Sequence, residues 1–137
     1  MVATVTAGLR PTAVVVNPLT GLVYVANWNG SLTVIDGATN LVANTVSVSS
    51  YPFNALAVDT MRNEIYIATG VGPTGGAGTV AILDGAKYTT GITWLANFYN
   101  ETPDALAFDP TTGNISAASS YDTVEMYVNH VPSPPSK

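Results

Sequence analysis

Apolar residues occur along this sequence in short runs separated by turn-forming residues, a pattern that predicts β-strands rather than helices. Three of these runs resemble one another, at 13–16, 55–58 and 105–108. Each is followed by five residues that open with Asn or Asp and close with Gly or Asn. Asn and Asp accept local backbone hydrogen bonds, and Gly and Asn tolerate a positive φ, so these segments predict tight turns. Each run therefore begins a predicted β-hairpin.

Further strands follow each hairpin turn in the same order. Second strands are predicted at 22–27, 64–69 and 114–119, third strands at 31–36, 79–84 and 123–128, and fourth strands at 41–48 and roughly 90–98. Ala13, Ala55 and Ala105 are equivalent, at spacings of 42 and 50 residues, and the Gly-rich insertion 70–78 explains the longer one. Four strands in a repeat of about 40–45 residues are typical of a β-propeller blade.

The fold class predicted is all-β, with about three propeller blades of four antiparallel strands. Residues 1–8 match 42–49 and predict an outer strand, followed by blades at 11–50 and 51–100, a three-stranded blade at 101–130 and a Pro-rich tail at 131–137. Three prolines in the tail remove too many ladder donors for a strand. The N-terminal strand is thus out of phase with the blades, as expected of a unit that a neighbour completes.

The segment Tyr24-Val-Ala-Asn27 and the later Val-Ile-Asp-Gly-Ala-Thr-Asn at 34–40 resemble the YVTN family of β-propeller repeats. The second repeat keeps Ile-Tyr-Ile-Ala-Thr at 65–69, whereas the third has Ser116 where Tyr is expected. The resemblance covers residues 1–130. It implies an extracytoplasmic protein, periplasmic, secreted or on the cell surface. It also implies kinship with propellers that form non-catalytic parts of redox enzymes.

Three blades are too few to close a ring, which takes at least about four. Open blade faces and strand edges need a cover. A head-to-tail homodimer of six blades is the simplest closed arrangement, with each N-terminal strand completing the other chain's last blade. The alternatives are a fragment of a larger propeller, such as a redox-enzyme subunit, and a cell-surface or filament component. The partners expected are the chain itself or another propeller-bearing chain.

The composition argues against several other functions. Only 9% of the 137 residues are charged, the net charge is −5, and the four basic residues are scattered. Nucleic acid is therefore a poor partner. No apolar run reaches the ~20 residues of a membrane-spanning helix. The absence of cysteine excludes disulfides and thiolate chemistry.

No catalytic arrangement emerges from the residue spacing. His130 is the only histidine and lies beside the Pro-rich tail, the Gly-rich insertion lacks a Gly-Lys-Ser/Thr motif, and no carboxylate pair has catalytic spacing. The repeated acidic residues Asp36, Asp84, Asp59 and Asp109 are interpreted as turn caps. We therefore predict a non-enzymatic protein with no cofactor, no metal and no catalytic residue.

Candidate assembly or binding residues lie in three kinds of place. The end strands, which would pair between chains, supply Val2, Val5, Val124 and Met126. Trp28 is a candidate exposed anchor, or alternatively covers the core of its blade. Trp94 and Phe98, on one face of an outer strand, either contact a partner or pack between blades. The Gly-rich insertion, a candidate binding loop, supplies Gly75 and Gly76.

Overall fold

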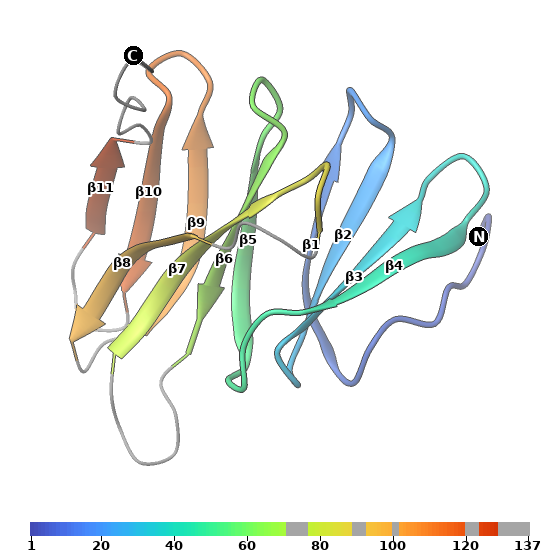
Figure 1. The fold of residues 1–137 in the computed structure, drawn as a ribbon, viewed down its shortest axis with the longest axis horizontal. Helices are drawn as coiled ribbons and strands as arrows, with labels where there is room; N and C mark the ends of the chain where they lie inside the picture. The colour runs from blue at the N-terminus through green and yellow to red at the C-terminus, as the bar shows by residue number, and fades with distance from the viewer. Residues whose placement is uncertain (71–76, 89–92, 100–101, 120–123, 129–137) are drawn as a thin grey trace, which may run out of the picture.

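The computed structural model describes residues 1–70, 77–88, 93–99, 102–119 and 124–128, and these form eleven strands in three antiparallel sheets (Figure 1). The first sheet contains β1 (Pro11–Asn17), β2 (Leu22–Asn27), β3 (Ser31–Asp36) and β4 (Leu41–Ser47). The second contains β5 (Phe53–Asp59), β6 (Glu64–Thr69), β7 (Ala77–Asp84) and β8 (Thr93–Tyr99). The third contains β9 (Pro103–Asp109), β10 (Asn114–Ser119) and β11 (Val124–Val128). The all-β prediction is confirmed.

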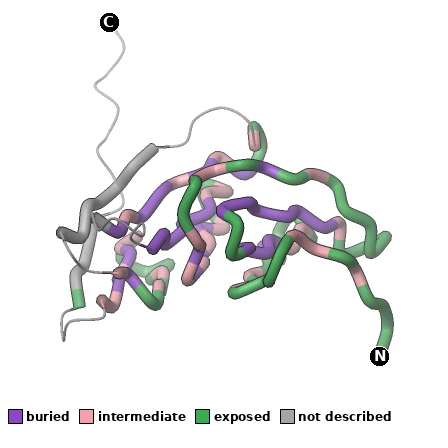
Figure 2. Tube along the Cα trace, turned by 90° about the horizontal axis from the view of Figure 1, so that it is seen from below, coloured by how far each residue is buried: buried purple, intermediate pink, exposed green. Residues whose placement is uncertain are grey.

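Each sheet is a meander in which consecutive strands pair, with β1, β5 or β9 at one edge. These three edge strands lie side by side, β5 between β1 and β9 (Figure 1). The sheets therefore stack face against face, and the trace follows an arc with the N-terminus at one end (Figure 2). Among the described residues no helix is long and apolar enough to cross a membrane.

The strand predicted over 1–8 is not formed: β1 begins at Pro11, and residues 1–7 belong to no strand. A strand requires a partner edge, and residues 1–7 pair with no described strand of the same chain. The segment instead reaches the first sheet through the Gly8 amide, which donates to Thr33 Oγ1 at 3.2 Å. A Cβ on Gly8 would lie 2.6 Å from Asn27 Nδ2, so this close approach requires glycine.

The predicted turn caps are confirmed by the hydrogen bonds after β1, β5 and β9. The side-chain oxygens of Asn17, Asp59 and Asp109 accept from the backbone amide two residues later at 2.8–3.0 Å. The closing residues have positive φ: Gly21 72°, Asn63 54° and Gly113 75°. Asp36 and Asp84 also cap their turns, each accepting at 2.8 Å from the amide two residues on.

Two apolar clusters join the sheets. The larger lies between the first and second sheets and contains Tyr24, Leu32 and Val46 from one side, and Phe53 and Ile65 from the other. The smaller lies between the second and third sheets and is built on Tyr66, Val80 and Ile115. Apolar burial between sheets is therefore the main stabilising interaction of the fold.

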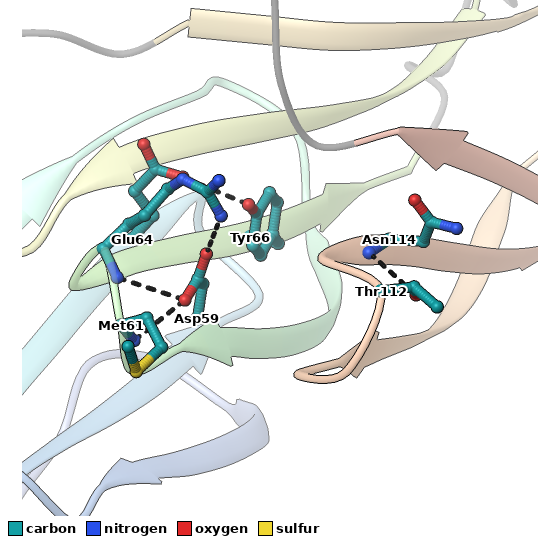
Figure 3. Close-up of polar contacts among 7 residues, drawn as sticks. Asp59, Met61, Glu64, Tyr66, Thr112 and Asn114 are labelled. Atoms are coloured by element: carbon teal, nitrogen blue, oxygen red, sulfur yellow. Dashed lines mark hydrogen bonds and ion pairs between the residues drawn. The ribbon is translucent and has the colours of Figure 1, made fainter. Parts of the chain in front are cut away.

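The two central tyrosines occupy equivalent positions but differ in their polar contacts. The Tyr66 hydroxyl donates to Glu64 Oε2 at 3.1 Å, and its ring stacks on Phe108 with centroids 6.1 Å apart (Figure 3). The Tyr24 hydroxyl is buried and makes no hydrogen bond with a described residue. Burial raises the pKa of the Tyr24 hydroxyl, and the nearby Tyr88 raises that pKa further. The contact with Tyr88 does not meet the geometry of a hydrogen bond to the Tyr24 hydroxyl.

This difference predicts opposite responses to the same substitution. Tyr24→Phe removes a buried hydroxyl without a partner, so we expect unchanged or slightly higher stability. Tyr66→Phe removes a hydrogen bond to a carboxylate, so we expect a loss of about 1–2 kcal/mol. Chemical denaturation of both variants at equal chain concentration measures the two changes. A larger loss for Tyr24→Phe would contradict the assignment.

Candidate functional site

The three sheets differ in how far their faces are covered. No residue of β5 is exposed, because the second sheet has a neighbour on both sides. Its Leu56 side chain packs toward the first sheet, while Ala57 packs toward the third. Among the described residues, the first and third sheets each have a neighbouring sheet on one face only. These two uncovered faces are the candidate functional site.

The uncovered face of the first sheet, called here the head face, carries branched apolar side chains. Val14 is 65% exposed and Val16 is 50% exposed, although both lie in the interior of a strand. The ladder places Val25 and Val23 opposite them on the same face, Val25 buried at 8% exposure and Val23 half-buried. Strand-interior valines at this exposure form an apolar surface of the kind that marks an interaction site.

Residues 1–8 lie against part of the head face. Gly8 contacts Thr33, whose hydroxyl also accepts from Asn27 Nδ2 at 3.0 Å. Val5 is half-buried, whereas Val2 is 97% exposed. Of the two N-terminal candidates, only Val5 therefore lies partly against the protein.

The uncovered face of the third sheet, called here the tail face, carries small side chains. Ala105 and Ala107 of β9 are exposed, and the ladder places Ala118 and Ser116 opposite them. Val124 in β11 is 68% exposed. Met126 also lies in β11, but its side chain is outside the described residues. The tail face is thus flat and apolar.

The two internal interfaces explain why the uncovered faces look as they do. At the first, Ala13 and Val15 meet a face that carries Leu56; at the second, Ala57 meets a face that carries Leu106 and Phe108. In both, a face with smaller edge-strand residues packs on a face with larger ones. The tail face has the position and the small residues of the small side of this pairing, and the head face, with Val14 and Val16, has the position of the large side.

A polar contact recurs at the same place in both internal interfaces. In the first strand of each repeat the ladder shifts by one residue, leaving Thr12, Asn54 and Asp104 unpaired in the strand. Thr12 Oγ1 donates to the Phe53 carbonyl at 2.7 Å, and Asn54 Nδ2 donates to the Pro103 carbonyl at 3.3 Å. Each bulge residue thus binds the backbone of the next sheet.

A second polar contact joins the hairpin turns and differs between the interfaces. Asn17 Nδ2 donates to Asn63 Oδ1 at 2.9 Å across the first interface. At the second, Gly113 stands at the position of Asn63, and Asp59 is instead held by Arg62 within its own turn at 2.9 Å (Figure 3). The Asp59 carboxylate is fully buried, so this ion pair neutralises a charge that the glycine cannot contact.

The predicted aromatic anchors have different outcomes. Trp28 is 47% exposed, and the Arg10 guanidinium carbon lies 5.1 Å from the centroid of its ring. Trp94 and Phe98 both lie in β8, but the ladder shifts by one residue between their pairs with Ala81 and Gly78. The side chains of both residues lie outside the described part of the structure, so their shared face stays a prediction. Gly75 and Gly76 lie outside the described residues.

Few side chains in the described part of the chain are suited to catalysis or to metal binding. No group of three or more His, Cys, Asp or Glu side chains there is placed to hold a metal ion. His130 lies outside that part. The Asp109 carboxylate has a lowered pKa because the Thr112 hydroxyl and the Thr111 amide donate to it, which fits a turn cap.

Comparison with known proteins identifies a fold but no family. No family model and no curated protein matches the sequence. A chain of Kuenenia stuttgartiensis hydrazine synthase is similar in structure, with a TM-score of 0.70 and 16% sequence identity over 90% of this chain. This chain spans about a third (34%) of that chain's length. Because 460 chains of solved structures match, the fold alone does not select a function.

The recurring bulge contact gives a stability prediction. Thr12→Val keeps the shape of the side chain but removes its donor to the Phe53 carbonyl, so we expect a loss of about 1 kcal/mol. Thr45→Val makes the same change at an exposed position of β4 and should alter stability by less than about 0.5 kcal/mol. Denaturant unfolding of both variants measures the difference. Equal effects would mean that the contact contributes nothing.

Proposed function

We propose that this chain is a non-catalytic β-propeller module of the YVTN type that functions by assembly. Its sheets are propeller blades, and a ring is completed by a second copy joined head to tail, giving six blades. Such a ring would present its blade-face loops for binding to protein or other ligands. An extracytoplasmic location accompanies the proposal, on the strength of the family resemblance.

The observation that carries the proposal is the match between the two uncovered faces. The tail face stands at the position of the small side, and the head face at the position of the large side, of an interface that the chain already forms twice. Exposed strand-interior valines are costly in water unless another surface covers them. A tail face from a second copy is the surface whose shape most closely repeats the existing partner.

The N-terminal segment supports the same arrangement. Val46 of β4 is buried in the cluster between the first and second sheets. Val5 occupies the corresponding place in the sequence match of 1–8 with 42–49, and it is half-buried beside the head face. Among the described strands, β11 has a partner only on its β10 side. Addition of residues 1–8 of a neighbour to the free edge of β11 would give each segment its missing ladder.

A second candidate function has some support from the structural comparison. The similarity to a longer hydrazine synthase chain, of which this chain covers 34%, favours a role as a non-catalytic part of a larger redox enzyme. In that case the uncovered faces would meet blades of other polypeptides. Purification from the native source distinguishes the two, since an enzyme part would co-elute in constant ratio with a cofactor-bearing subunit.

The assembly proposal makes a prediction about two equally exposed apolar residues. Val14 is 65% and Leu41 is 66% exposed, but only Val14 lies on the interior of the head face. Val14→Asp would bury an unpaired charge in the joint, so we expect the dissociation constant to rise at least about a hundredfold. Leu41→Asp should change it by less than about threefold.

Sedimentation velocity over a range of chain concentrations measures both variants against the natural sequence. The natural sequence should sediment as a discrete two-chain species, and circular dichroism should show both variants folded. Monomers at every concentration would overturn the self-assembly proposal, and a continuous series of larger species would favour an open filament instead.

A further inference from the structure

The third sheet does not repeat the bulge contact that the first two sheets make. Thr12 and Asn54 each donate a hydrogen bond to the backbone of the sheet that follows. Asp104 occupies the same step of the third sheet and is exposed. Its Oδ1 accepts from Asn54 Nδ2 of the second sheet at 3.5 Å, and in a ring its other carboxylate oxygen would face the sheet that follows. An ionised carboxylate has no proton to donate. Asp104 therefore cannot make the contact that its position makes elsewhere.

The group that Asp104 would face on a head-to-tail neighbour is also an acceptor. By the repeat, that group is the carbonyl of Pro11, the residue equivalent to Phe53 and Pro103. The neighbouring Thr12 hydroxyl has one proton, and its closer acceptor is the Phe53 carbonyl. The joint consequently needs a donor that belongs to the head side.

Arg10 supplies such a donor next to Pro11. It is one of only four basic residues, it is exposed, and its backbone φ of 51° is unusual for a residue other than glycine. Its guanidinium lies over the Trp28 ring, and the Trp28 amide donates to the Arg10 carbonyl at 3.0 Å. The equivalent positions in the second and third repeats carry Pro52 and Thr102, which are uncharged.

We infer that Arg10 of one copy forms an ion pair with Asp104 of the next copy, across a head-to-tail joint of the head and tail faces. The inference rests on the proposed function and names the polar contact that selects a second copy as the partner. Stacking on Trp28 holds the guanidinium plane and leaves its N–H edge available for a carboxylate. Within the chain, the bulge residue donates to the following sheet. At the joint between molecules, the bulge residue Asp104 would instead accept from Arg10 of the following sheet.

The test begins with reversal of each charge. Arg10→Glu and Asp104→Arg each place like charges together at both joints of a two-chain ring, so each should raise the dissociation constant about tenfold or more. Lys87→Glu changes the net charge by the same amount as Arg10→Glu and should leave association within about threefold. Circular dichroism and thermal melting confirm folding, and Arg10→Gln replaces Arg10→Glu if the latter does not fold.

Mixing the two reversed chains provides the decisive comparison. In a ring of one Arg10→Glu chain and one Asp104→Arg chain, both joints again bring opposite charges together. We expect the mixture to assemble within about threefold of the natural affinity and to form mixed dimers, which fluorescent labels on the two chains detect. The double variant Arg10→Glu/Asp104→Arg should likewise assemble.

The outcomes separate this inference from the proposal on which it rests. If the natural chain assembles but charge reversal has no effect, or the mixture fails to recover, the ion pair is wrong and the assembly proposal stands. If the natural chain is monomeric throughout, both are wrong. Weakening by each reversal with recovery in the mixture supports the pair.

Discussion

The fold depends on one interaction, the face-to-face packing of apolar sheets. When successive residues of a strand are apolar, both faces of the sheet are apolar, because neighbouring side chains point to opposite faces. Both faces of such a sheet are shielded from water only if a second sheet packs on each of them. The second sheet meets this condition, since no residue of β5 is exposed. The first and third sheets meet it on one side only. The candidate function follows from that imbalance.

The two internal interfaces share apolar packing but differ in the polar residues at their bulge and turn positions. The bulge position holds Thr12, Asn54 and Asp104, and the turn position holds Asn63 at one interface and Gly113 at the next. Where Gly113 provides no side chain, Arg62 holds the buried carboxylate of Asp59 instead. Repeats can therefore share apolar packing while their polar residues distinguish one interface from another, which is what an assembly with a defined order of blades requires.

The sequence predicted the features that depend on local chemistry. Strand order and turn caps followed from apolar runs and from residues such as Asp59 and Gly113, whose effects act within four residues. Contacts between sheets, such as those of Thr12 and Asn54, were not predicted, because the bulges that make these positions equivalent are known only from the ladder. The same bulges make Phe53, not Pro52, the equivalent of Pro11. The strand expected over 1–8 is not formed, because the segment pairs with no described strand of its own chain.

The central claim is that the head face of one copy meets the tail face of another, and cysteine cross-linking tests it most directly because the chain has no natural cysteine. Chains carrying Val14→Cys and chains carrying Ala105→Cys are mixed and treated with a short bis-maleimide, beside each chain alone. The account predicts that the mixture gives covalent dimers linking the two variants, while each variant alone gives few. Equal cross-linking within one variant, or none in the mixture, would contradict it.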